Sequence, residues 1–276
     1  MSYRSILVHV EVDPAAKPRL ALAVDLANQF DTALIGVAAE MYEPSTLASG
    51  AGYFDGETLV AEAKVVQDDL QLAESKFLAA AAAVRSDVYW RSGVTTPHEM
   101  ITYHSRAADL IVAGPRRPES FGFRTRADPG DLVMQSGRPV LVAPLDLAKL
   151  DASSIVIGWK NTRECRRAVA DALPFLKRAR QVLLVEISET RGESEAQADL
   201  ADVGTFLGRY GAKISTTVRA PGKATTAQAL LEVADAQDAG LIVAGGYGHG
   251  RLSEWIFGGV TQELLEGAHK AVLFSH

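Results

Sequence analysis

Cysteine is nearly absent from this sequence, since Cys165 is the only one, so an intramolecular disulfide and a cysteine metal cluster are both excluded. Basic residues are outnumbered, with 28 Lys and Arg against 34 Asp and Glu and a net charge of −6. Binding to nucleic acid or to an anionic membrane needs a basic face, so neither partner is expected. The sequence also lacks an eighteen-residue apolar run and a signal peptide in its first twelve residues. We therefore expect a cytoplasmic protein.

What is present is an internal repeat. The segments ADLIVAG, at residues 108–114, and AGLIVAG, at residues 239–245, are nearly identical. Each half also opens on a similar apolar run, SILVHV from Ser5 and SIVIGW from Ser154, and closes on another, PVLVA and AVLFS. The 276 residues suit two domains of ordinary size. We predict a duplicated domain, with boundaries at 1–146 and 152–276.

Apolar runs alternate with amphipathic segments within each half. In the first half we expect strands at residues 6–10, 33–38, 88–91 and 110–113, and helices at 17–30, 58–84 and 97–107. Such alternation predicts an α/β fold with parallel sheets covered by helices on both faces. The join at residues 144–153 is short, so the halves should pack together as a pseudo-twofold pair.

Near the end of the second half, a strand expected at residues 241–244 leads into the glycines Gly245, Gly246, Gly248 and Gly250. A further pair, Gly258 and Gly259, opens a helix expected at about residues 260–265. Glycines let a ligand approach the backbone closely. A helix N-terminus adds unpaired N–H groups and the positive end of the helix dipole. Together these features predict an anion-binding site.

The spacing of Gly245, Gly248 and Gly258 matches Gly-x2-Gly-x9-Gly-Ser/Thr, the nucleotide-binding signature of the universal stress protein family. With the duplication and the closing strands, the chain resembles the tandem universal stress proteins over almost its whole length. The resemblance implies two open parallel five-stranded sheets of the Rossmann-like, adenine nucleotide alpha hydrolase-like class. It also implies ATP or another adenine nucleotide, with Mg²⁺ as its companion, at the carboxyl ends of the first and fourth strands.

The resemblance assigns site residues in the C-terminal half. Gly245 and Gly248 would shape the loop around the ribose and phosphates, while Gly258 and Gly259 would offer N–H groups to the phosphates. Three positions depart from the family pattern. Gly259 replaces a hydroxyl residue, a loss of about 1.5–3 kcal/mol of binding. Lys160 stands where the family carries an aspartate, and Glu186 where an aliphatic residue closes over adenine. Lys160 and Glu186 would form an ion pair filling the site, or Lys160 would serve the phosphates.

The first half has lost the glycine signature. Gly114 has no glycine three residues on, and prolines at 115, 118 and 129 remove backbone donors. No nucleotide is therefore expected there in the family's binding mode. The same segment carries four arginines, which would recognise an anionic group or a partner subunit, or would belong to a solvated loop: Arg116, Arg117, Arg124 and Arg126.

Catalytic candidates are few. His9 and Glu11 share one face of the first strand, as a general acid/base pair or, more simply, as a hydrogen-bonding pair that is buried or at the rim of a site. His249, inside the glycine loop, would touch a phosphate or face solvent. No nucleophile elbow, Walker lysine or metal site is apparent. We expect a nucleotide-dependent regulator without catalysis. The alternatives are a scaffold protein that has lost the nucleotide and, less favoured, a slow ATPase.

The resemblance to the universal stress proteins also implies assembly through the closing strands. The edge at residues 272–274 should pair with another half, within the chain as a pseudo-dimer or across a homodimer.

Overall fold

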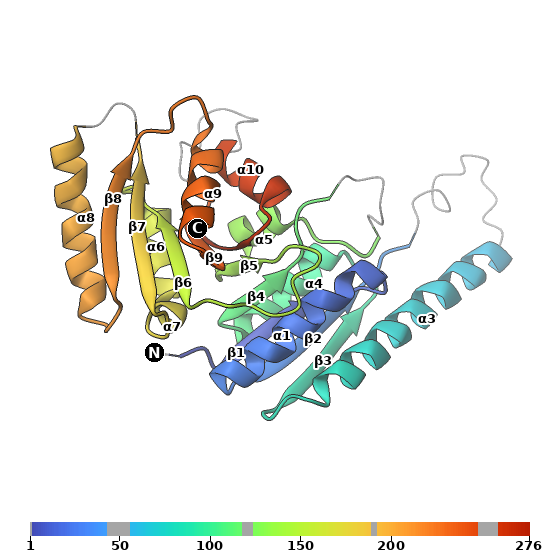
Figure 1. The fold of residues 1–276 in the computed structure, drawn as a ribbon. Helices are drawn as coiled ribbons and strands as arrows, with labels where there is room; N and C mark the ends of the chain where they lie inside the picture. Colours follow the sequence, from blue (N-terminus) through green and yellow to red (C-terminus); the bar gives the residue numbers. More distant parts are fainter. Residues whose placement is uncertain (1, 43–55, 118–123, 189–191, 248–258) are drawn as a thin grey trace.

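Strands and helices alternate along the whole chain in the structure, a computed structural model that describes residues 2–42, 56–117, 124–188, 192–247 and 259–276 (Figure 1). The N-terminal half contains the strands β1 (Ser5–His9), β2 (Ala33–Ala39), β3 (Val88–Gly93), β4 (Leu110–Ala113) and β5 (Val140–Val142). Its helices are α1 (Lys17–Phe30), α3 (Gly56–Ala81), α4 (Pro97–His104) and α5 (Pro129–Gln135), with the 3-10 helices η1 (Pro14–Ala16) and η2 (Ser105–Ala107).

The C-terminal half repeats this series. Its strands are β6 (Ser154–Gly158), β7 (Gln181–Ile187), β8 (Ile214–Arg219), β9 (Leu241–Gly245) and β10 (Ala271–Ser275). Its helices are α6 (Arg163–Asp171), α7 (Leu173–Leu176), α8 (Glu193–Gly208), α9 (Thr226–Ala236) and α10 (Gly259–Gly267).

All ten strands form one sheet, in the order β3-β2-β1-β4-β5-β10-β9-β6-β7-β8. Each half is a parallel five-stranded sheet with the same internal order, and the halves meet where β5 and β10 pair antiparallel. Leu141 pairs with Leu273 at the centre of this junction. The predicted α/β class, the parallel five-stranded sheets and their pseudo-twofold packing are confirmed. So is the pairing of the 272–274 edge with the other half, which occurs within the chain.

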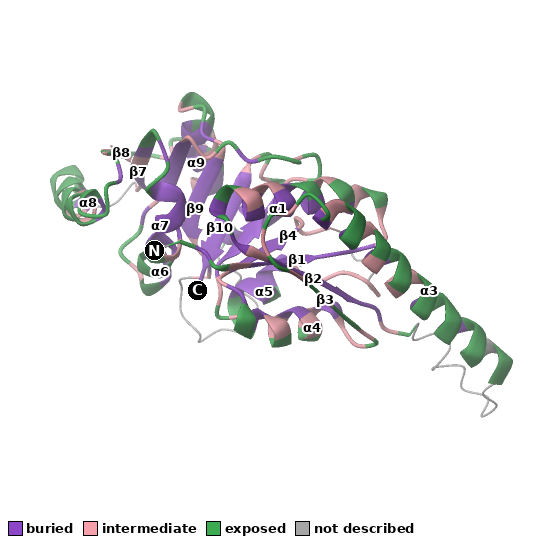
Figure 2. Ribbon diagram, turned by 90° about the horizontal axis from the view of Figure 1, so that it is seen from below, coloured by how far each residue is buried: buried purple, intermediate pink, exposed green. Residues whose placement is uncertain are grey.

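Two layers of helices cover the sheet. Side chains of alternate strand residues enter different cores, so Ile6 and Val8 pack on one face and Leu7 on the other. The first core includes residues of α1, α3, α6, α7 and α8, and the second includes residues of α4, α5, α9 and α10. Figure 2 shows buried strands across the middle of the molecule, with α8 and α3 at opposite ends. Each fully buried Leu, Ile or Phe contributes roughly 1.5–3 kcal/mol through removal from water.

Aromatic packing joins the halves on the first face. The rings of Tyr3, Phe30 and Phe175 pack edge to face, with centroids 5.0–5.6 Å apart. The Tyr3 hydroxyl also donates to the carbonyl of Asp171, at 2.7 Å. The short join expected at 144–153 is therefore matched by direct contact between the halves.

The predicted element boundaries mostly agree with the structure, and the differences have local causes. The helix expected at residues 97–107 ends at His104 and tightens into η2. The helix after β6 ends at Asp171, because Pro174 cannot donate to a continuous ladder and instead stands in the first turn of α7. Across the described ranges, no helix combines the length and apolar character needed to cross a bilayer.

Candidate functional site

A cavity of about 520 Å³ lies at the carboxyl ends of β6, β7 and β9. The strand order reverses between β6 and β9, the place where open α/β sheets characteristically bind ligands. The volume is within the range of ligand pockets. Its lining comprises Gly158, Trp159, Lys160, Asn161, Thr162, Cys165, Val185, Glu186, Ile187, Ser188, Thr226, Leu230, Ala244, Gly245, Gly259, Val260 and Thr261.

The N-terminus of α6 forms one wall. Thr162 is the N-cap, and its hydroxyl accepts from the backbone N–H of Cys165 at 3.3 Å. A Cβ atom on Gly245 would lie 2.6 Å from that same nitrogen. Glycine at the end of β9 therefore allows α6 to begin directly against the strand and brings its N-terminus to the cavity.

The N-terminus of α10 forms another wall, through Gly259, Val260 and Thr261. The first N–H groups of a helix have no partner within it. The first turn of α10 carries no acidic residue that would oppose an anion. Thr261 fixes the preceding loop, because its hydroxyl accepts from the backbone N–H of Tyr247 at 3.2 Å. Two helix N-termini thus converge on one hollow. The first turn of α6 already carries the carboxylate of Glu164, so the N-terminus of α10 is the one that favours an anionic ligand.

The two charged residues singled out in the sequence both line this cavity. Lys160, two residues after β6, is exposed, whereas Glu186, on β7, is only 6% exposed. Lys160, Glu186, Gly245 and Gly259 are therefore brought together around one hollow. Ligand binding by them stays a prediction. The other predicted residues, Gly248, His249 and Gly258, lie outside the described residues.

A second cavity, of about 200 Å³, occupies the corresponding end of the N-terminal half. Beneath it lies the predicted pair: His9 is 2% exposed, and its Nδ1 is 3.2 Å from Glu11 Oε1. Burial lowers the pKa of His9 to about 4, an effect that Arg19 reinforces and Glu11 opposes. His9 is therefore neutral at pH 7 and the pair is buried, while its role stays a prediction.

The four arginines of the degenerate segment all contact carboxylates of the same half. Arg116 pairs with Asp128, Arg117 and Arg126 pair with Asp13, and Arg124 pairs with Glu40, at nitrogen–oxygen distances of 2.7–3.0 Å. Their side chains are only 17–25% exposed. The interpretation of these residues as a solvated loop is therefore wrong.

Several residues that shape the two cavities were not predicted from the sequence. Thr162 was identifiable as a threonine immediately before an amphipathic helix, the usual signal of an N-cap. Asp13 and Arg19 had no such signal, because their role depends on contacts with residues about a hundred positions later, or with a strand ten residues earlier.

Arg116 also connects the two halves. Its backbone N–H donates to the carbonyl of Leu265 on α10 at 2.9 Å, and its Nη1 lies 3.8 Å from Glu266 Oε1. Its guanidinium lies close to the hydroxyl of Tyr247, in the loop that follows β9, and opposes the rise in the pKa of that hydroxyl that burial causes. A Cβ on Gly130 would clash with the Tyr247 hydroxyl and lie 2.8 Å from Arg116 Nη2, so glycine leaves room for both side chains to meet there. The far end of α10 is therefore attached to the N-terminal half.

Known proteins resemble this chain in the sequence of its C-terminal part and in fold over almost its whole length. Residues 153–276 match the model of the universal stress protein family, so the C-terminal part contains a universal stress protein domain. No curated protein matches the sequence. A universal stress protein from Archaeoglobus fulgidus DSM 4304 is similar in structure, with a TM-score of 0.69 at 14% identity, over 98% of this chain and 94% of that one. A functionally unknown protein from Pseudomonas aeruginosa PAO1 gives 0.57 at 17%, over 98% and 92%. At these identities the likeness establishes the fold of both halves.

Proposed function

We propose that the chain is a tandem universal stress protein with units at 1–146 and 152–276, whose C-terminal unit binds ATP or a related adenine nucleotide. We further propose that binding serves sensing or regulation in a stress response, in the cytoplasm and without catalysis. The family match covers the C-terminal part, and the related fold extends over both halves. A single observation carries the proposal: the N-termini of α6 and α10 meet at a cavity of nucleotide size.

In the proposed complex, the phosphates lie against the N–H groups of α10 from Gly259 onwards. Lys160, exposed at the rim, adds positive charge on the phosphate side. Glu186, buried on β7, would accept hydrogen bonds from the ribose hydroxyls or the adenine amino group. Mg²⁺ enters the proposal only with the phosphates, as it usually binds through them and one or two carboxylates.

Occupancy would reach the N-terminal half through α10. This helix has its first residues at the cavity and its last turn bonded to Arg116, and it also contacts α5. A ligand that shifts α10 would therefore alter the contact between the halves, or the contacts of a second copy of the chain in a homodimer.

The test is calorimetric titration of the whole chain with ATP. The informative variant is Gly259→Asp, since none of the described residues lies within 4 Å of a Cβ added at Gly259 and its backbone φ is not positive. Aspartate in a first helical turn is compatible with folding, but its charge would repel phosphate. We expect saturable binding by the unaltered chain and at least about a tenfold loss in the variant. No heat from the unaltered chain up to about 1 mM ATP would refute nucleotide binding.

A second candidate function rests on Glu186. A buried carboxylate in the same hollow as Lys160 is the arrangement expected if the site has been given up and the fold kept as an interaction scaffold. Acid extraction of the purified protein distinguishes the two. Adenine nucleotide in the extract contradicts the scaffold, whereas an empty extract together with a silent ATP titration supports it.

A further inference from the structure

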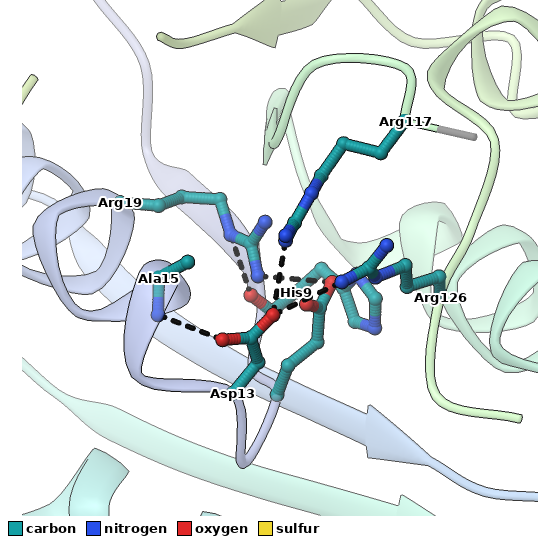
Figure 3. A network of polar contacts seen from close by, with 7 residues as sticks. His9, Asp13, Ala15, Arg19, Arg117 and Arg126 are labelled. Carbon is teal, nitrogen blue, oxygen red and sulfur yellow. Dashed lines mark hydrogen bonds and ion pairs between the residues drawn. The ribbon is translucent and has the colours of Figure 1, made fainter. Parts of the chain in front are cut away.

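The cavity of the N-terminal half is lined by arginines. Arg19, Arg116, Arg117 and Arg126 all border it, together with Glu11, at the ends of β1 and β4. Figure 3 shows three of these guanidinium groups, from Arg19, Arg117 and Arg126, directed at the same small region around His9 and Asp13. They come from two separate parts of the chain, helix α1 and the connection between β4 and α5, so the fold itself gathers them.

The charges in this cluster do not cancel. Arg19 Nη2 lies 3.2 Å from Glu11 Oε1, while Asp13 Oδ2 is shared by Arg117 at 2.9 Å and Arg126 at 3.0 Å. Burial would raise the pKa of Glu11, but Arg19, His9 and Arg126 outweigh it and lower that pKa. The pKa of Asp13 is lowered first by the backbone N–H of Ala15 and then by Arg117 and Arg126. Three cations thus surround two carboxylates, since the fourth arginine, Arg116, is paired with Asp128.

The excess charge coincides with unused hydrogen-bond donors. In the described part of the chain, the Nε and Nη1 atoms of Arg126 are buried and have no hydrogen-bond partner. Leaving donors of a charged group buried and unpaired is costly. The Arg126 side chain is 17% exposed and borders the cavity, so a ligand there reaches its exposed atoms, and a shift of the guanidinium toward the ligand would bring the buried donors to it.

We propose that the N-terminal half binds a small phosphate-bearing anion in this cavity, held by Arg126 and Arg117 above the buried Glu11–Arg19 pair. Arginine is the side chain best suited to phosphate recognition. The volume of about 200 Å³ is below that of pockets that enclose drug-sized ligands. It accommodates a phosphate group with few further atoms, as the free ion or the end of a small metabolite, and it excludes a nucleoside. This site is independent of nucleotide binding in the C-terminal half.

Calorimetric titration of the whole chain with inorganic phosphate, at constant ionic strength in chloride buffer, tests the proposal. We expect one saturable site with a dissociation constant of about 1 mM or lower. Arg126→Gln and Arg117→Gln should each weaken phosphate binding about tenfold or more. Arg85→Gln, which removes an exposed arginine of the same half, is the charge-matched control and should bind as the unaltered chain does.

Two variants at the site guard against loss of folding. Among the described residues, Arg117 forms its ion pair with Asp13 alone, and its side chain is 25% exposed, so its replacement should disturb the fold little. Glycerol phosphate is titrated in parallel: tighter binding than inorganic phosphate identifies the end group of a metabolite, and equal or weaker binding identifies the free ion. No saturable heat from either up to about 10 mM overturns the proposal. So does phosphate binding that survives both arginine substitutions but is lost in Gly259→Asp, because the ion would then occupy the C-terminal cavity.

Discussion

The two cavities occupy equivalent places in the duplicated fold, yet their charges are exchanged. β1 and β6 start at Ser5 and Ser154, which pair with the first residues of β2 and β7. Counting from these serines sets Glu11 opposite Lys160. In the first half an acid therefore follows the first strand, whereas in the second half a lysine stands there. Duplication conserved the backbone and left the chemistry of each cavity free to diverge.

The difference extends to what packs against each strand-end glycine. Gly245 is in close contact with the backbone of α6 at Cys165, so the N-terminus of α6 reaches the cavity. Gly114, its counterpart in the repeat, instead packs against the guanidinium of Arg19. In the first half, the side chains of Arg19 and its neighbours occupy the space at the strand ends. In the second half, backbone N–H groups border the corresponding space. This explains the smaller cavity, about 200 Å³ against 520 Å³.

The largest expected effect tests the exchanged charges directly. Glu11→Gln should lower the free energy of unfolding by about 3–5 kcal/mol, because it leaves the buried Arg19 without its carboxylate. Glu11 and Arg19 side chains are 6% and 7% exposed. Lys160→Gln, at the equivalent exposed position, should change stability by less than about 0.5 kcal/mol.

Urea denaturation of the two variants measures this difference. Equal shifts would mean that the ionic pair beneath the N-terminal cavity contributes no more than a surface residue.

The pH dependence of stability should also separate the halves. His9 has a folded pKa of about 4, below its ordinary 6.5, so the unfolded chain binds more protons between these values. Stability from this group is present above pH 6.5 and is lost as the pH falls towards 4, by about 3 kcal/mol. The lowered pKa of Glu11 acts in the same direction at more acidic pH. Gly158, the residue equivalent to His9 in the second half, has no titratable side chain and contributes no pH dependence of stability.

Denaturation at a series of pH values, with His9→Gln as the comparison, checks this. The variant should have a flatter profile between pH 6.5 and 4. A profile unchanged by the substitution would show that His9 is not held neutral.

The architecture was largely readable from the sequence because it depends on local periodicity and on repetition. The segments ADLIVAG and AGLIVAG, and the closing strands, encode buried parallel strands by composition alone. Pairing of residues 272–274 with the other half was expected from the family resemblance, and it covers a sheet edge that would otherwise be exposed.

The side chains that line the two cavities were harder to predict from the sequence. Lys160 and Glu186 were placed correctly at strand ends. For the four arginines, an anionic ligand, a partner subunit and a solvated loop all stayed open, since Asp13 meets Arg117 and Arg126 only after folding. Pairing over such sequence distances leaves no periodic signal.

A serine at position 259 would supply the hydroxyl of the universal stress protein signature. It should increase the difference in ATP affinity between the two cavities. Gly259→Ser adds a side chain at a position where no atom of the described residues lies within 4 Å of the new Cβ. A hydrogen bond to a charged phosphate is worth about 1.5–3 kcal/mol, so ATP should bind about tenfold or more tightly. Gly208→Ser, at another uncrowded glycine at the end of α8, is the control. Calorimetry that finds the two variants equal would place the phosphates away from α10.

The smallest expected effect concerns the link between the halves. Tyr247→Phe removes the hydroxyl that meets Arg116 and should lower the free energy of unfolding by about 1 kcal/mol. Arg116→Gln should cost more, because it also breaks the pair with Asp128. If both residues stabilise the same junction, the double variant loses less than the sum, with a coupling of about 0.5–1.5 kcal/mol. Combining Tyr247→Phe with Arg178→Gln, on the other face beside Phe30, should instead give additive losses. Additive losses in both pairs would mean that Tyr247 and Arg116 each stabilise only their own half of the chain. They would then give no support for transmission between the halves through α10.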